Sequence, residues 1–214
     1  MDARRLRAVT LHLMRKAVEH LRAGDPRMAA LIACVGACRI RYSPPNYETV
    51  ARSIVSQQLS GKAAGTIYGR LVDACAPSPV SPASVLQFRE ERLRSFGLSS
   101  AKSRYLRSLA EDTLNGTIDF ALLPRLNDED AIAHLTSAKG VGVWTAQMFL
   151  IFALRRRDVL PLGDVGIRNA IHSSYRLNSP PSPDEMLAIA APWRPYASIA
   201  SWYLWRSLEF HGQL

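Results

Sequence analysis

The sequence has few cysteines: of 214 residues only Cys34, Cys38 and Cys75 carry a thiol. Three thiols cannot supply the paired framework of a small disulfide-rich secreted protein. No fourth cysteine or histidine cluster completes a zinc site with them. We interpret all three as core residues, with Cys34 and Cys38 spaced four apart on one helical face. This cysteine usage predicts a reducing intracellular compartment.

The sequence also lacks long hydrophobic runs and any series of strands with alternating hydrophobicity. The longest apolar segments, 28–38 and 144–154, are too short to span a bilayer. The arginine-rich N-terminus has neither the apolar core nor the cleavage site of a signal peptide. Apolar residues recur instead with the period of an α-helix along most of the chain. These features predict an all-α fold.

Acidic residues are scarce relative to basic ones, with 18 Asp and Glu against 27 Lys and Arg and a formal charge of +9. Such an excess indicates a polyanionic partner, nucleic acid first and an anionic membrane surface second. A membrane binder would need a continuous basic amphipathic surface beside exposed apolar residues, which the sequence does not offer. A generally basic protein without such a partner is the remaining alternative.

Proline, glycine and capping residues divide the helical pattern into segments. Ser43-Pro44-Pro45-Asn46 marks an internal boundary, and the polar stretch 57–61 interrupts an apolar helical pattern. The expected helices cover residues 4–22, 26–35, 47–75 with that interruption, 84–93, 100–114, 143–154, 165–175, 184–191 and 196–208. A further helix, capped by Asn127 or Asp128, carries Ile132 and Leu135 and leads into the stretch described next. In the helix over 100–114 we expect Tyr105, Leu106, Leu109 and Leu114 to face inward.

The most informative stretch runs from Leu135 to Asp164 and contains Gly140-Val141-Gly142 between two helices. Glycines at such a turn admit positive φ and let the backbone come close to a phosphate. The unpaired N–H groups that open the following helix then point at the anion. The tripeptide alone is equally typical of a plain turn between helices. The longer string Leu-x4-Gly-Val-Gly-x2-Thr-Ala, over 135–146, is far more restrictive.

This string resembles the helix-hairpin-helix of the HhH-GPD DNA glycosylase superfamily. Residues 160–166, Leu-Pro-Leu-Gly-Asp-Val-Gly, resemble the Gly/Pro-rich loop and aspartate of that family. Ile-Val-Ser-Gln-Gln-Leu-Ser at 54–60 and Gly97-Leu98-Ser99 with Lys102 match as well. The resemblance spans roughly residues 20–208 and is to the branch that includes 3-methyladenine DNA glycosylase II and its short yeast-type relatives. One departure is Lys139, where the family often has proline.

The resemblance implies a monofunctional DNA glycosylase of base excision repair. Such an enzyme flips an alkylated base (3-methyladenine or 7-methylguanine) out of the duplex and hydrolyses its N-glycosidic bond, leaving an abasic site. Asp164 would be the catalytic carboxylate, which stabilises positive charge on the sugar and orients or deprotonates water. From local sequence alone, Asp164 is equally well read as a helix N-cap.

Trp144 stands just before Thr145-Ala146, where lyase-type relatives carry a lysine that forms a Schiff base. The resemblance therefore implies hydrolysis without abasic-site lyase activity. Relatives of the endonuclease III type also carry a C-terminal four-cysteine iron–sulfur cluster, whereas no cysteine here follows Cys75. We therefore expect no iron–sulfur cluster and no required cofactor.

Aromatic residues suggest where the base binds. Trp144 and the pair Trp202-Tyr203 match aromatic pocket positions of the alkyl-base branch, and Met148 lies one helical turn after Trp144. Indole faces attract the cationic bases that ring alkylation produces, by roughly 0.5–2 kcal/mol. Helix packing is the alternative for Trp202. It is our preferred interpretation for Trp193 and Trp205.

Further site residues follow from the resemblance. Gln58, with Leu59 beside it, matches the wedge that fills the gap left by the flipped base; a solvated helix face is the alternative. Backbone-contacting residues would be Gly140, Gly142, Val143, Thr145, Ser99, Lys102 and Arg168. Arg168 would otherwise be an ordinary surface residue. The family hairpin often binds Na⁺ or K⁺ through main-chain carbonyls, which here are those of Thr136, Ala138 and Val141.

We expect two helical subdomains with the active-site cleft between them. Residues 46–159 would form a central bundle with the wedge and hairpin, and residues 1–45 and 160–214 the second subdomain. The expected partner is double-stranded DNA containing alkylated bases, bound by a monomer, in the cytoplasm and nucleoid of a prokaryote or the nucleus of a eukaryote. Two alternatives remain: a glycosylase for deaminated or ring-opened bases, and a non-catalytic helix-hairpin-helix module.

Overall fold

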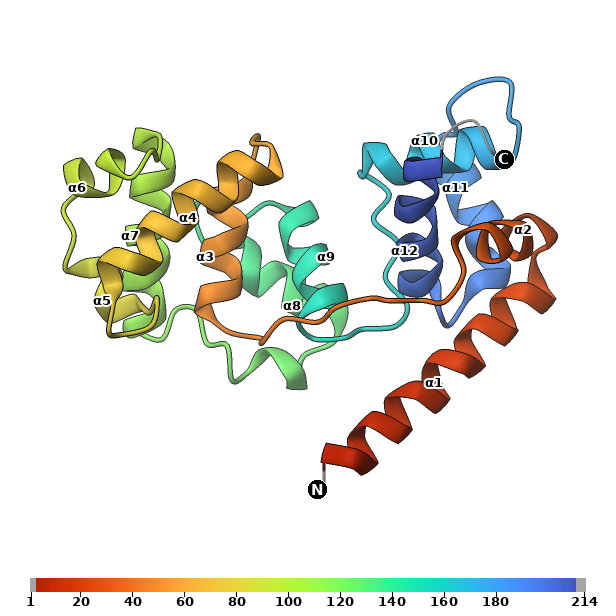
Figure 1. Cartoon of the computed structure of the whole chain (residues 1–214), viewed down its shortest axis with the longest axis horizontal. Helices are drawn as coiled ribbons and strands as arrows, with labels where there is room; N and C mark the ends of the chain where they lie inside the picture. The colour runs from red at the N-terminus through yellow and green to blue at the C-terminus, as the bar shows by residue number, and fades with distance from the viewer. Residues whose placement is uncertain (1–2, 211–214) are drawn as a thin grey trace. The chain divides into compact units, whose positions relative to one another are not determined.

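A computed structural model describes residues 3–210, with side chains described from residue 12 to residue 209. Within residues 3–210 the chain forms α-helices, short 3₁₀ turns and loops, and no strand (Figure 1). The all-α prediction is confirmed. The helices are α1 (Ala3–Gly24), α2 (Pro26–Val35), α3 (Tyr47–Ser56), α4 (Gly61–Cys75), α5 (Pro82–Leu86), α6 (Glu90–Ser95), α7 (Ser100–Leu114), α8 (Asp128–Thr136), α9 (Val143–Phe152), α10 (Val165–Ser174), α11 (Pro183–Ala190) and α12 (Ala197–Ser207). The 3₁₀ turns are Leu123–Arg125, Ala191–Trp193 and Leu208–Phe210.

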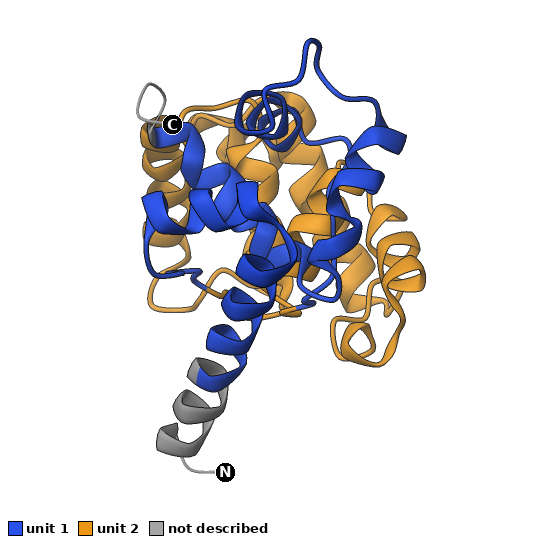
Figure 2. Ribbon diagram, turned by 90° about the vertical axis from the view of Figure 1, so that its right-hand side faces the viewer, with its two compact units in different colours: residues 1–41, 156–214 blue, residues 42–155 orange. Residues whose placement is uncertain are grey.

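The chain divides into two compact units (Figure 2). Unit 1 comprises Met1–Arg41 and Arg156–Leu214, and unit 2 comprises Tyr42–Arg155. The boundaries expected from the sequence lie a few residues C-terminal to these divisions. Of that expectation, residues 1–2 and 211–214 lie outside the described part of the chain. Unit 1 therefore holds α1, α2 and α10–α12, and unit 2 holds α3–α9.

Side-chain caps explain where most helices begin. At eight of the helix starts within residues 3–210, the residue before the first turn accepts a hydrogen bond from a backbone N–H two or three residues later. These residues are Asp25, Asn46, Ser60, Ser81, Ser99, Asn127, Asp164 and Ser182. Each such cap contributes about 0.5–2 kcal/mol relative to alanine, because it satisfies an N–H that the helix itself cannot pair.

Unit 2 is built on α7, against which α3, α5 and α6 pack. Val50 and Ile54 of α3 are fully buried, as are Leu106 and Leu109 of α7. The helices α8 and α9 pack against each other, and α9 also packs on α3 (Figure 1). The pair α8–α9 is thus attached to the rest of unit 2 through α3, the helix that leads into residues 57–60.

Unit 1 has its own core, contributed by all five of its helices. Trp193 and Tyr203 are the largest of its fully buried side chains. Asp25 is buried beside them. It caps α2 and accepts further hydrogen bonds from Trp193 Nε1 at 2.8 Å and from the Tyr175 hydroxyl. The packing interpretation of Trp193 therefore agrees with the structure.

Three expectations about local structure are wrong. The helix expected over 84–93 is instead two short helices, α5 and α6, because Arg107 of α7 donates to the carbonyls of Leu86 and Phe88 and stabilises the end of α5. The second error is Leu114, which was expected to face inward but is 60% exposed, because it lies in the last turn of α7.

The third error is the helical face that Cys34 and Cys38 were expected to share, whereas Cys75 lies in the core as expected. Helix α2 ends at Val35, so Cys34 and Cys38 do not share a helical face. Both are partly exposed, whereas Cys75 is buried. Desolvation raises the pKa of the Cys38 thiol to about 11.

No helix within residues 3–210 combines the length and apolar character that a bilayer crossing needs.

Candidate active site

The hairpin between α8 and α9 turns at Gly140. Its φ is +84°, and a Cβ added there would lie 2.4 Å from Cδ2 of Tyr105. Gly142 differs: its φ is −89°, and an added Cβ would meet nothing within 4 Å. The turn therefore requires glycine at position 140 both for its backbone conformation and for its close approach to α7.

Helix α9 begins at this turn with Gly142 as N-cap and no side-chain cap. Val143 and Trp144 in its first turn are 56% and 46% exposed, while Thr145 is buried. The first N–H groups of a helix have no partner within it and carry its positive dipole end. With neither a capping side chain nor a Cβ at Gly142, an anion can approach these groups closely.

The predicted wedge lies at the end of α3. Gln58 is exposed with φ +57°, an uncommon conformation for a residue with a side chain, and Leu59 is 39% exposed. Neither residue belongs to a helix, so the alternative of a solvated helix face does not describe them. Gln57 donates from Nε2 to the Gly140 carbonyl oxygen at 2.9 Å.

An open hollow of about 530 Å³ brings the wedge, the hairpin and the start of α7 together within unit 2. The sequence predicted five of its lining residues as DNA contacts. The lining residues are Gln57, Gln58, Ser99, Ala101, Lys102, Tyr105, Gly140, Val141 and Gly142.

Lys102 differs from the simplest expectation of a lysine that reaches towards DNA. Its Nζ donates to the Val55 carbonyl oxygen at 2.8 Å and also to the Gln57 carbonyl oxygen. Partial burial lowers the pKa of this ammonium group. Ser99 caps α7 by accepting from the Lys102 backbone N–H at 3.3 Å. Both residues thus also support the local fold.

Asp164 lies at the start of α10 in unit 1 and is only 8% exposed. Its Oδ1 accepts the Ile167 backbone N–H at 2.8 Å and the Trp205 Nε1–H at 3.0 Å. A Cβ added at Gly166 would lie 3.1 Å from this oxygen, so glycine leaves room beside the carboxylate. The capping interpretation of Asp164 is therefore correct, and it does not exclude a chemical role.

Trp205 is the residue that sequence reasoning missed, because it was assigned to packing alone. Trp202 lies one turn earlier on α12, is partly buried, and meets the ring of Tyr203 edge-on at 5.0 Å. Tyr203 is fully buried, and its hydroxyl donates to the Gly36 carbonyl oxygen at 3.1 Å. In unit 1, the Tyr203 ring therefore packs edge-on against the Trp202 ring and has no exposed face of its own.

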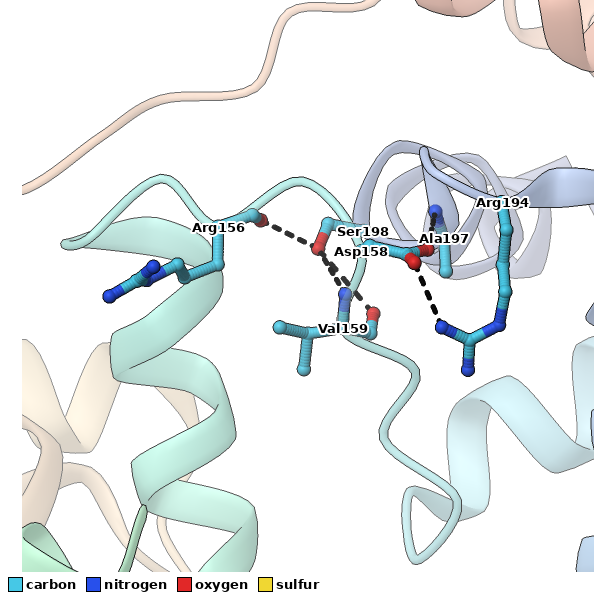
Figure 3. Close-up of polar contacts among 6 residues, drawn as sticks. All are labelled: Arg156, Asp158, Val159, Arg194, Ala197 and Ser198. Atoms are coloured by element: carbon cyan, nitrogen blue, oxygen red, sulfur yellow. Dashed lines mark hydrogen bonds and ion pairs between the residues drawn. The ribbon is translucent and has the colours of Figure 1, made fainter. Parts of the chain in front are cut away.

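The segment that leads to Asp164 is fixed to the N-terminus of α12 (Figure 3). Ser198 donates from Oγ to the Arg156 carbonyl oxygen at 2.7 Å and accepts the Val159 backbone N–H at 3.0 Å. Asp158 accepts the Ala197 N–H at 3.3 Å and pairs with Arg194 at 2.8 Å. Residues 156–159 and Asp164 are thus both bound to α12, the first near its start and the second through Trp205.

The remaining predicted residues lie on these same elements. Met148 on α9 is partly buried, and Arg168 on α10 is exposed. Among the three carbonyls expected to bind a cation, that of Ala138 accepts the Val141 N–H at 3.1 Å, which leaves one lone pair on that oxygen. Within the described part of the chain, His, Cys, Asp and Glu side chains form no cluster of three or more that could hold a metal ion.

Comparison with known proteins identifies the family. The model of the HhH-GPD superfamily of base excision DNA repair proteins matches residues 51–195. The chain belongs to this superfamily. The matched segment contains the wedge, the hairpin and Asp164, but it ends before Trp202 and Trp205.

Two curated HhH-GPD relatives come from Schizosaccharomyces pombe. DNA-3-methyladenine glycosylase 1 is 35% identical over 90% of this chain and 86% of its own length. The alkylbase DNA glycosidase-like protein mag2 is 31% identical over 92% of this chain and 95% of its own length. Among solved structures, the 3-methyladenine DNA glycosylase Mag1 of the same organism, in complex with abasic DNA, is 35% identical. It superposes with a TM-score of 0.80 over 91% of this chain and 97% of its own.

Proposed function

We propose that this HhH-GPD protein is a monofunctional DNA glycosylase that excises alkylated bases, 3-methyladenine and 7-methylguanine, and leaves an abasic site. The observation that carries the proposal is the nearly buried Asp164 carboxylate, oriented by a backbone N–H and by an indole N–H. The similarity to the 3-methyladenine DNA glycosylase of Schizosaccharomyces pombe, in sequence and in structure, supports the choice of substrate.

The mechanism assigns Asp164 to the charge that develops on the sugar. As the N-glycosidic bond breaks, positive charge builds on the deoxyribose ring, and an oriented carboxylate in a site of low dielectric stabilises it strongly. Two donors on Oδ1 hold the carboxylate in one orientation before the substrate arrives. The same group can orient the attacking water, whose proton must leave as the bond to C1′ forms.

The indoles account for the preference for alkylated bases. Trp144, which is 46% exposed on α9, offers an aromatic surface for a base that carries positive charge. Trp202 on α12 is the second proposed base-binding indole, with Tyr203 beneath it. A cationic base is already a good leaving group, so the reaction needs no strong general acid.

Trp144 also supports a reaction that stops at the abasic site. An indole has no amine with which to form a Schiff base on the sugar. The DNA strand should therefore stay intact after base release until it is treated with alkali. We further propose that the hairpin N–H groups and Arg168 bind phosphates, that Gln58 and Leu59 fill the gap in the duplex, and that the hairpin carbonyls accept a monovalent cation.

The decisive experiment measures release of free base from methylated duplex DNA by the wild type and by Asp164→Asn. Asparagine is as good an N-cap as aspartate, so the fold should persist. Loss of the charge should lower the single-turnover rate by about 10²- to 10³-fold, the usual effect of removing one group that stabilises the transition state. Binding to abasic duplex should stay within a few-fold of the wild type.

Asp25→Asn is the matched control, since Asp25 is also a buried N-cap in unit 1 that accepts a tryptophan N–H. It should lower stability while the rate per folded molecule stays unchanged. Full activity of Asp164→Asn would disprove the proposed mechanism. Release of deaminated or ring-opened bases, but not methylated ones, would reassign the substrate; no release from any damaged duplex would favour a non-catalytic binding module.

A further inference from the structure

The wedge and the hairpin are joined by one side chain, that of Gln57. Its Nε2 donates to the Gly140 carbonyl oxygen at 2.9 Å, across a separation of more than eighty residues in the chain. Gly140 has φ +84° and lies against the ring of Tyr105, so its carbonyl has a fixed direction. Gln58, the proposed wedge, is the next residue. The amide of Gln57 therefore connects the proposed phosphate-binding turn directly to the residue before the wedge.

Lys102 fixes the same loop from the other side. Its ammonium group donates to the carbonyls of Val55 and Gln57, at the C-terminal end of α3. These carbonyls lack partners within the helix and lie at its negative dipole end, where a cation is favourable. Gln57 is thus held through its backbone oxygen by Lys102 and through its side chain by Gly140.

This arrangement explains how Gln58 keeps its backbone conformation. A non-glycine residue at φ +57° has a strained backbone, which persists only where the surroundings determine it. On the N-terminal side of Gln58, the two contacts of Gln57 fix the position of the backbone. On its C-terminal side, Leu59 donates its N–H to the Ser56 carbonyl oxygen at 3.2 Å, and Ser60 caps α4. Release of Gln57 would leave the conformation of Gln58 less determined.

We propose that Gln57 is a positioning residue that couples phosphate binding at the hairpin to insertion of the wedge. The proposal rests on the proposed glycosylase function and deepens it. When a phosphate binds the N–H groups after Gly140, the hairpin becomes fixed on the duplex. The Gln57–Gly140 hydrogen bond then holds Gln58 at a set distance from that phosphate. Backbone binding and base extrusion thereby become one event.

The test uses the isosteric variant Gln57→Glu, which keeps the shape of the side chain but has no amide N–H to donate, together with Gln57→Ala. Extrusion is followed by the fluorescence of 2-aminopurine placed beside the target base, which rises when stacking is lost. Both variants should show a loss of about three- to tenfold in extrusion and in single-turnover excision from duplex, the effect of one hydrogen bond. Affinity for undamaged duplex should stay within about twofold for Gln57→Ala.

Excision from methylated single-stranded DNA separates positioning from a general loss of activity. There no base has to leave a duplex, so Gln57→Ala should equal the wild type on that substrate. Gln87→Ala is the matched control: Gln87 is an exposed glutamine of unit 2, next to α5. It should leave both readouts unchanged.

Lys102→Met provides an independent check on the coupling. Because Lys102 and Gln57 hold the same loop, their effects should not be independent. The double variant Gln57→Ala/Lys102→Met should therefore lose less extrusion than the product of the two single-variant fold-losses. Wild-type extrusion and duplex excision by Gln57→Ala, or equal losses on single- and double-stranded substrates, would overturn the inference. Absence of excision by the wild-type protein would instead refute the proposed function, and the 2-aminopurine signal would still test the coupling.

Discussion

Replacement of Gly140 by alanine tests the geometry of the hairpin most directly. The added methyl group would lie 2.4 Å from Cδ2, 2.5 Å from Cγ and 2.9 Å from Cβ of Tyr105. The Tyr105 ring could rotate away from the first two contacts. The third contact is with Cβ, which is fixed to the backbone of α7, so rotation cannot relieve it. Either α7 or the turn must therefore move.

The expected loss in the free energy of unfolding of Gly140→Ala has two parts. Alanine in the left-handed region at φ +84° costs roughly 1–2 kcal/mol more than glycine. Insertion of a methyl group where no space exists typically costs roughly 1–3 kcal/mol more. The sum predicts that Gly140→Ala lowers the free energy of unfolding by roughly 2–5 kcal/mol. Tyr105→Ala in the same chain should recover part of the second term and none of the first.

Gly142→Ala is the matched control, since its φ is −89° and its added Cβ would meet nothing within 4 Å. Urea unfolding of the two variants should show a large loss of stability for Gly140→Ala and a much smaller one for Gly142→Ala, which loses only the N-cap preference of glycine over alanine. Affinity for duplex DNA should fall for both, because the methyl group at position 142 would occupy the approach to the N–H groups of α9. Equal stability of Gly140→Ala and the wild type would refute the steric reasoning.

Two further predictions concern unit 1. Trp205→Phe removes the indole donor to Asp164 and should lower single-turnover excision by about tenfold, the value of one hydrogen bond to a charged group. Its affinity for abasic duplex should equal that of the wild type. An equal fall in affinity would contradict a role of Trp205 in orienting the carboxylate. Burial raises the pKa of Tyr203 to about 12, against about 10 in an unfolded chain. Between these values the folded state keeps a proton that the unfolded state loses, so the free energy of unfolding should fall as pH rises from about 10 to 12. Tyr203→Phe should be less stable than the wild type at pH 7, because it lacks the hydrogen bond to Gly36, but its free energy of unfolding should fall less steeply above pH 10. If the free energies of unfolding of the two proteins, measured with urea, fall in parallel above pH 10, Tyr203 does not titrate as the structure implies.

Much of the fold could be predicted from the sequence because its helix boundaries are set by local chemistry. Asp25 and Ser99 cap α2 and α7, which begin at the residues expected from the sequence, 26 and 100. The division of the helix expected over 84–93 involves a partner distant in the chain. Arg107 of α7 stabilises the end of α5 and thereby divides an expected helix, and no local pattern shows this contact.

The same distinction holds at the site. Gly140 and Asp164 were predicted because the residues around them form recognisable strings. The hydrogen bond from Trp205 to Asp164 joins residues forty-one apart, and the sequence offers only the spacing of Trp202 and Trp205, one helical turn on the same helix. The contacts of Lys102 with the end of α3 were likewise missed, because a basic residue in a DNA-binding protein was assigned to the ligand rather than to the fold.

The two interpretations of Asp164, helix cap and catalyst, become one when the caps of this chain are compared. Among the helix starts that the structure describes, six of the eight side-chain caps are serine or asparagine, so capping at these positions does not require a carboxylate. A buried charge is costly unless several donors compensate it. At Asp25 that compensation comes from two backbone N–H groups, a phenol and an indole, and it stabilises the fold. At Asp164 a backbone N–H and an indole N–H both meet Oδ1. The capping bond is therefore the means by which the start of α10 holds a charged group in a fixed orientation. The use of aspartate there, where serine would cap equally well, agrees with the catalytic role that we propose for Asp164.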